Sequence, residues 1–280
     1  MRPLTPDAIL HAVRELPALP AVVLELIQSL GDSQVTAEQL AVKISHDQAI
    51  AAKTLRLANS SFYGLPRQVT SIAEATAILG LRTLRSVATA AGLAGGFGGS
   101  RCQGFDFDAL WRHAIGTALT ARAVAQRVRL DEDAAFTLGL LHDIGRLVLI
   151  SSFPDEYAQA IAYRAEQDCL MHAAERHYFG TDHADVGGVM AEHWRFAPEI
   201  VAAIACHHRP PHASAKSLTD VVHVADNIAH GLDLSRKADD MVPLLTLDAW
   251  SRLALSDAQC AEVFDAVSQQ HDAVCHALLP

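Results

Sequence analysis

The side chains with the clearest chemical potential lie in the middle of the chain, within residues 138–149. Here His142 and Asp143 are adjacent inside a mostly apolar run. Burying an imidazole and a carboxylate costs free energy unless a partner satisfies them. A metal ion satisfies both, because imidazole supplies a neutral nitrogen ligand and carboxylate an anionic oxygen ligand. A helix with one satisfied core histidine and one surface aspartate would explain the same dipeptide, so the pair needs support from other residues.

That support comes from other histidines and acids. The chain contains 15 histidines, and nine of them lie between His172 and His230. The candidate metal ligands are His113, His142, Asp143, His183, His207, His208 and Asp226. A helical bundle can bring side chains from several helices to one interior point. This set indicates a divalent metal site with one or two ions. Its nitrogen and oxygen donors permit Fe, Mn, Zn or Ni. The alternative is a buried hydrogen-bond network without a metal.

Composition restricts the function classes. The chain has 280 residues, of which 50% are hydrophobic and 19% charged, which indicates one large globular domain or two smaller ones. A net charge of −10 argues against general binding to nucleic acid, although it permits a small phosphorylated ligand at a local site. We expect no signal peptide and no membrane span. Five cysteines without a CxxC pair predict neither a disulfide framework nor a thiolate zinc site, so we expect a reducing, cytoplasmic setting.

The elements that must position these side chains are predicted to be helices throughout, because helical spacing dominates and strand-like alternation is hard to find. The fold class is therefore all-α. A short first helix is followed by prolines at 17 and 20 and by a helix over 21–30. Thr36 and Ser71 are expected to form capping boxes, and Asp47 to cap the helix that runs through residue 57. Further helices are expected up to Gly80 and over 81–93.

Six glycines between residues 92 and 104 predict a flexible connection, or simply a surface loop, between a lobe of residues 1–100 and a lobe of residues 101–280. In the second lobe, each candidate ligand falls on a predicted helix. His113 lies on a predicted helix over 110–128, and the His-Asp pair on the next helix, capped by Asp131 or Asp133. His183 lies on a helix capped by Asp182, the paired histidines end a helix over 198–208, and Asp226 lies on a helix over 217–231. The tail, 247–278, is expected to form two more helices.

The order His, His-Asp, His, His-His, Asp resembles the HD superfamily of helical metal-dependent phosphohydrolases, and in its fuller form the HD-GYP branch. By position, this resemblance implies that His113, His142, Asp143 and Asp226 are core ligands. His183, His207 and His208 would then extend the site to a second metal, with Asp143 as the bridge. Three departures argue against cyclic dinucleotide hydrolysis. Arg209-Pro210 follows the double histidine where a GYP segment is expected, Ala109 stands where a glutamate is expected, and Arg146 replaces the usual lysine.

A larger part of the chain, about residues 15–230, resembles the HDOD family, the HD-related output domain of bacterial signalling. The matching motifs are LPALP at 16–20, KTLRLANS at 53–60, SI at 71–72, AILG at 77–80, GLLHDIG at 139–145, DHADVG at 182–187 and HHRP at 207–210. The resemblance implies a two-lobed helical bundle whose second lobe is HD-like. It also implies a regulatory role, usually without established catalysis, and a signalling protein or a small phosphorylated molecule as partner.

Three functions remain open at this point. The chain could be a regulatory module, a metal-dependent phosphohydrolase or phosphodiesterase acting on a nucleotide or phosphoester, or a scaffold with empty histidines. If it is an enzyme, Asp143 and Arg146 are the candidate catalytic residues. Arg146 would hold a phosphate or else pair with an acid. His223 would be a packed core histidine or would orient a ligand. Seven histidines are expected at the surface or in loops: His172, His177, His193, His212, His230, His271 and His276.

Overall fold

The structure, a computed structural model, describes residues 4–15, 36–60, 63–97 and 102–279. Helices make up the regular structure of these residues, and they contain no strand. The N-terminal helices are α1 (Pro6–Arg14), α3 (Ala37–Ser45), α4 (Gln48–Ala58), α5 (Ile72–Leu79) and α6 (Leu81–Phe97). The all-α prediction is confirmed. The predicted helix over 21–30 and the motif at 16–20 lie outside the described residues.

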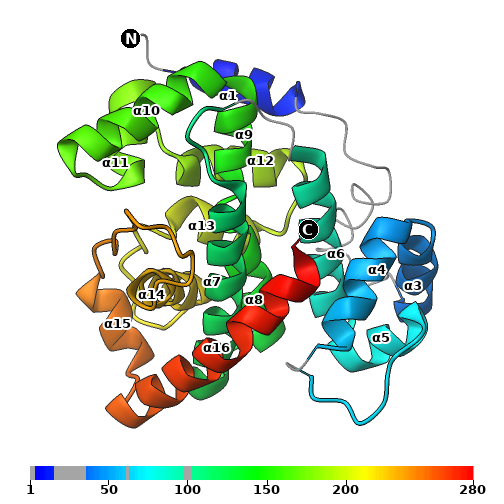
Figure 1. Ribbon diagram of the computed structural model, residues 1–280. Coiled ribbons are helices and arrows are strands. Elements are labelled where there is room, and N and C mark those ends of the chain that lie inside the picture. Colours follow the sequence, from blue (N-terminus) through cyan, green and yellow to red (C-terminus); the bar gives the residue numbers. More distant parts are fainter. Residues whose placement is uncertain (1–3, 16–35, 61–62, 98–101, 280) are drawn as a thin grey trace.

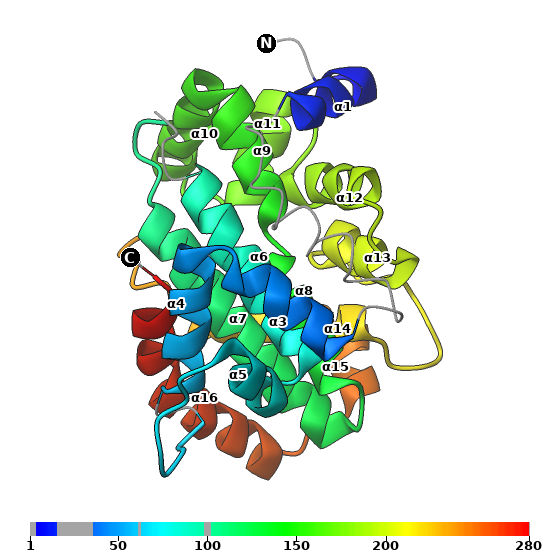
Figure 2. The ribbon, with the colours of Figure 1, turned by 90° about the vertical axis from the view of Figure 1, so that its right-hand side faces the viewer.

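Ten helices follow in the remainder of the described chain. They are α7 (Phe107–Val128), α8 (Glu132–Leu141), α9 (Ile144–Ser152), α10 (Pro154–Gln167), α11 (Met171–Phe179), α12 (His183–His193), α13 (Pro198–Cys206), α14 (Leu218–Gly231), α15 (Leu247–Leu253) and α16 (Asp257–Leu278). The long helix α7 lies at the centre and packs against α8, α14 and α16 (Figure 1). Helices α3, α4 and α5 are grouped beside α6, on the opposite side from α14 and α15 (Figure 1), and they face the viewer in Figure 2.

Local sequence signals explain where several helices begin. Thr36 and Gln39 form the expected capping box, since Thr36 Oγ1 accepts the amide of Gln39 at 3.3 Å and Gln39 Oε1 accepts the amide of Thr36 at 3.0 Å. Asp131 and Asp182 cap α8 and α12 as predicted. At the end of α4, the Asn59 side chain bonds to both backbone groups of Val69 at 2.7 and 2.8 Å. Asn59 therefore closes α4 and ties its end to the segment before α5.

The glycine-rich stretch differs from expectation. Helix α6 continues to Phe97, through three of the six glycines, so the helix predicted to end at residue 93 is longer. Packing against α4 and α8 offsets the low helix propensity of glycine there. Helix α1 contacts α9 and α12, and the amide of Leu4 donates to the carbonyl of Phe179 at 2.7 Å. One hydrophobic core runs through the described helices from α1 to α16. The division near residue 100 stays a prediction.

The sequence predicted that the His142-Asp143 pair lies within a helix. In the structure it lies at the break between α8 and α9. Helix α8 ends at Leu141, and Asp143 has φ −95° and ψ 10° before α9 begins. The stretch Glu132–Ser152 is long and apolar enough to cross a membrane, contrary to the expectation of no such run, but 83% of its most apolar window is buried in the fold. It therefore serves as the protein core, and the break turns both polar side chains inward.

Candidate metal centre

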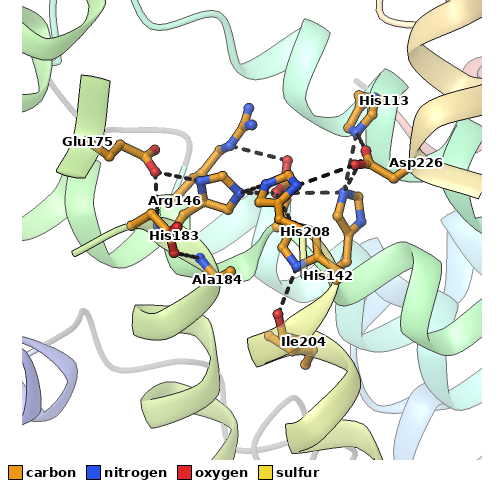
Figure 3. A network of polar contacts seen from close by, with 12 residues as sticks. His113, His142, Arg146, Glu175, His183, Ala184, Ile204, His208 and Asp226 are labelled. Atoms are coloured by element: carbon orange, nitrogen blue, oxygen red, sulfur yellow. Dashed lines mark hydrogen bonds and ion pairs between the residues drawn. The ribbon is translucent and has the colours of Figure 1, made fainter. Parts of the chain in front are cut away.

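All seven predicted ligands meet inside the bundle formed by the C-terminal helices (Figure 3). They come from the second turn of α7, the α8–α9 break, the first residue of α12, the two residues after α13 and the middle of α14. Six are buried, and the side chain of the seventh, His208, is 9% exposed. The structure thus brings together residues separated by more than 100 positions. Their role as metal ligands remains a prediction.

Two carboxylates organise the cluster. Asp143 Oδ1 lies 3.0 Å from His183 Nε2, 3.6 Å from His142 Nε2 and 3.8 Å from His207 Nε2. The other carboxylate, Asp226, has its Oδ1 3.0 Å from His113 Nε2 and 3.6 Å from His142 Nε2. His142 therefore lies between the two acids, which makes the cluster continuous.

Hydrogen bonds of the Nδ1 atoms orient three of the histidine rings so that their Nε2 atoms face the centre of the cluster. His142 Nδ1 donates to the carbonyl of Gly139 at 2.7 Å, and His207 Nδ1 donates to that of Ile204 at 2.8 Å. His183 Nδ1 donates to Glu175 Oε2 at 2.6 Å. A neutral imidazole carries one N–H, so Nε2 of a neutral His142 or His207 presents a bare lone pair to the interior. This is the orientation in which histidine binds metals. His183, whose pKa is raised, carries a hydrogen on Nε2 as well, next to Asp143 Oδ1, and would lose it on binding a metal.

Two pairs of ring nitrogens face each other across the cluster. His113 Nε2 lies 3.3 Å from His142 Nε2, and His183 Nε2 lies 2.9 Å from His208 Nε2 (Figure 3). Two lone pairs at these distances repel unless a proton or a metal ion lies between them. Either a ring N–H that donates to the facing nitrogen or a metal ion between the two nitrogens satisfies this geometry.

Several buried atoms lack a well-aligned hydrogen bond from the described residues. They are Asp226 Oδ2, His207 Nε2, His208 Nδ1 and His113 Nδ1, whereas the two oxygens of Asp143 have ion-pair contacts with His183 and Arg146. Leaving such groups unsatisfied costs about 1–3 kcal/mol each. Divalent metals accept this donor set of imidazole nitrogen and carboxylate oxygen. The residues present therefore fit a metal centre. Three groups of three residues each have their ligand atoms within 4.8 Å of one another.

Burial and charge shift the protonation of these groups strongly. Burial lowers the pKa of His113 to about 4 and that of His207 to about 3, with neighbouring histidines adding to the effect. Burial alone would also lower the pKa of His183, but the carboxylates of Glu175 and Asp143 outweigh it and raise that pKa to about 10. For Asp143, burial opposes ionisation, yet Arg146 and the histidines hold its pKa well below the usual range. The carboxylate is thus ionised and available as a ligand.

Arg146 pairs with an acid of the cluster, in line with one of its two interpretations. Its Nε lies 3.2 Å from Asp143 Oδ2. It also lines a pocket that reaches the cluster at His113 and His208. Arg164 and Lys237 line the same pocket. The site therefore combines a candidate metal centre with a pocket that basic side chains line.

Two histidines expected at the surface or in loops are enclosed by the fold instead, His271 fully and His230 largely. The His230 side chain is 11% exposed, and its Nε2 lies 3.4 Å from Asp226 Oδ1. Its position one turn after Asp226 on α14 was the signal that could have identified it. His271 is 3% exposed and donates from Nε2 to the carbonyl of Arg112 at 2.8 Å, because α16 packs on α7. The exposed positions of four others were predicted correctly: His177, His193, His212 and His276.

Three further residues support the cluster. His223 donates from Nδ1 to the carbonyl of His207 at 2.7 Å, so it is a core histidine that also holds the ligand-bearing turn. His172 is partly buried, not a surface residue as expected; it lines the pocket, and its ring lies 4.6 Å from that of His208. Glu175, on α11, was missed, because no spacing rule relates it to His183 eight residues later.

Comparisons with known proteins agree with this picture. The HDOD domain matches residues 16–210. An HDOD domain protein of unknown function from Geobacter sulfurreducens is 25% identical, with a TM-score of 0.80 over 98% of this chain and 99% of that one. A candidate phosphohydrolase from Shewanella amazonensis SB2B is 26% identical, with a TM-score of 0.73 over 96% of each chain. A protein of Treponema pallidum (strain Nichols) is 27% identical over 81% of this chain, which spans only 44% of that relative's length.

Proposed function

Because the chain belongs to the HDOD family, we propose that it is a regulatory protein of bacterial signalling whose histidine and aspartate cluster binds divalent metal ions. In this proposal a small phosphorylated ligand enters the pocket above the cluster, and a signalling protein reads the outcome. The supporting observation is the convergence of buried, unsatisfied nitrogen and oxygen atoms at the end of a pocket lined by basic side chains.

The metal ions would be held by the seven predicted ligands. When bound, they supply Lewis acidity toward a phosphoryl oxygen. The protein's own contribution is electrostatic and geometric. Arg146 is oriented by Asp143 and can donate to a phosphate oxygen from inside the pocket. Arg164 and Lys237 also line the pocket and add positive charge to it, although Asp239 pairs with both. These cations give an acidic protein a local site for an anion.

Regulation is favoured over catalysis by the sequence after the paired histidines. Arg209 and Pro210 stand where the HD-GYP branch has its GYP segment, and the resemblance to HDOD proteins implies output through protein contacts. The signalling partner would dock elsewhere on the helical surface. Removing the ligands Asp143 and Asp226 together would then empty the centre while leaving the docking surface in place.

A phosphohydrolase is the second candidate function. It is supported by the ion pair between Asp143 and Arg146, of which Arg146 lines the pocket, and by the candidate phosphohydrolase of Shewanella amazonensis at 26% identity. In that case both residues would lie at the reacting phosphoryl group. Arg146 would hold the substrate phosphate, and Asp143 would be the acid shared between ions.

One experiment tests both functions. Untagged protein is analysed for bound metals, and then titrated by calorimetry with inorganic phosphate and a panel of nucleotides, with Mn²⁺ or Fe²⁺ present. The same panel is monitored for hydrolysis. We expect stoichiometric metal and phosphate-ligand binding without turnover. Turnover that disappears in His142→Ala would favour the phosphohydrolase, whereas protein that binds neither metal nor phosphate ligands under any condition would contradict both.

A further inference from the structure

Building on the proposed metal-binding function, we propose that His230 is an additional metal ligand, which forms with His113 and Asp226 a separate ion position facing the pocket. Asp240 would orient the His230 ring for this role. Neither the His-Asp motif order nor the family match includes His230, which lies beyond the matched residues 16–210.

The geometry places three donor atoms around one point. His230 Nε2 lies 3.4 Å from Asp226 Oδ1, and that oxygen lies 3.0 Å from His113 Nε2. The three ligand atoms lie within 4.8 Å of one another, and the ring centroids of His113 and His230 are 4.2 Å apart. Two imidazole nitrogens and one carboxylate oxygen are a common donor set for a divalent ion with open coordination positions.

The orientation of the His230 ring matches that of a ligand. Its Nδ1 donates to Asp240 Oδ1 at 2.8 Å, which directs Nε2 toward the cluster. Asp240 is itself held, since its Oδ2 accepts the hydroxyl of Ser235 at 2.8 Å and its Oδ1 the amide of Met241 at 3.0 Å. A carboxylate behind a histidine fixes the ring orientation and raises the basicity of a metal ligand.

The same arrangement occurs at the opposite end of the cluster, where Glu175 backs His183 at 2.6 Å. The histidines between them, His142 and His207, are backed by backbone carbonyls instead. The cluster thus has a carboxylate-backed histidine at each end. Of these four histidines, His230 lines the pocket and the other three do not.

This placement gives the additional position a specific use. His113 and His230 line the pocket together with Arg146. An ion held by this pair and Asp226 would meet a phosphate group that enters the pocket, while ions around Asp143 would lie deeper. The chemical class of ligand at this position is therefore a phosphate oxygen donor.

The test is the number of bound ions per chain. Wild type, His230→Ala and the matched surface control His193→Ala are loaded with Mn²⁺, dialysed and analysed by mass spectrometry of the metal. Mn²⁺ binding is also followed by electron paramagnetic resonance. We expect His230→Ala to bind one ion fewer, or to bind its weakest ion at least 10-fold more weakly, with helix content unchanged. The control should match wild type.

Two further variants keep the test decisive. His230→Gln serves if the alanine variant misfolds. Asp240→Ala should lower the affinity for the most weakly bound ion by about 10-fold or more, while the deeper ions stay bound. Wild-type stoichiometry and affinities in folded His230→Ala or His230→Gln would overturn the inference and leave His230 as an ion-pair partner of Asp226. Wild-type protein without any metal would instead overturn the proposed function.

Discussion

His183 Nδ1 lies 2.6 Å from Glu175 Oε2, and both side chains are completely buried. The same carboxylate oxygen accepts the backbone amide of His183 at 2.9 Å, and the other accepts the Tyr157 hydroxyl at 2.7 Å. A residue of α11 thereby holds the first residue of α12 and determines which nitrogen faces the cluster (Figure 3). The metal-binding potential of His183 depends on this contact.

Glu175→Gln should therefore weaken metal binding by about 10–100-fold, because the neutral amide cannot polarise the His183 ring as a carboxylate does. Calorimetric titration with Mn²⁺ measures the effect. Glu166→Gln, at an exposed position of α10, is the matched control and should bind as wild type does. Unchanged affinity in Glu175→Gln would show that His183 does not bind the metal.

Gly145→Ala should destabilise the protein by about 2–4 kcal/mol. An added Cβ would lie 2.0 Å from the carbonyl oxygen of His183 and 2.6 Å from the amide nitrogen of Gly187, so α9 and α12 would have to separate. Thermal and urea unfolding measure the loss. Gly231→Ala is the control, since its Cβ would meet nothing within 4 Å and α14 should gain helix propensity. Equal stability of the two variants would contradict this close helix contact.

Arg146→Ala should reduce the affinity for inorganic phosphate or nucleotides by about 10–100-fold, the effect of losing one charge-assisted hydrogen bond. Metal content should stay at the wild-type level, because the arginine donates to the ligand and is not itself a metal ligand. Arg56→Ala, an exposed position on α4, provides the control. If phosphate affinity is unaffected while the variant remains folded, the pocket does not bind phosphate through Arg146.

Metal-free protein should be most stable near pH 6.5. The pKa values of His113 and His207 are about 4 and 3 in the folded chain and about 6.5 when unfolded, so unfolding takes up protons on acidification. Stability present above pH 6.5 is then lost as the pH falls toward 4. The raised pKa values of His183 and His230, about 10 and 9, act in the opposite direction. Their stabilisation is full below pH 6.5 and is lost as the pH rises through 9 and 10.

Thermal unfolding in EDTA between pH 4.5 and 9.5 measures this profile, and a fall of several degrees is expected on each side, at about 1.4 kcal/mol per unit of pKa difference. Added Mn²⁺ should restore stability on the alkaline side, where the ion replaces the histidine protons. A melting temperature that is independent of pH would mean that the cluster is not closed to solvent as described.

Much of the candidate site could be predicted from the chain alone. The all-α class and helix starts at Thr36, Asp131 and Asp182 follow from local periodicity and capping, which depend on residues a few positions apart. The seven candidate ligands were identifiable because imidazoles and carboxylates in apolar segments need partners. Their type and order, with the motifs around them, were also sufficient to indicate the HDOD family.

Other features were decided by tertiary packing, because they depend on residues far apart in the sequence. Helix α6 passes through its glycines since α4 and α8 support it, and the helix breaks at His142-Asp143 so that both side chains point inward. Glu175 and His230 joined the cluster only when α11 and α14 were placed beside it. Local periodicity describes one helix at a time, whereas a pocket arises from how several helices pack, and that packing alone determined which polar groups share one buried site.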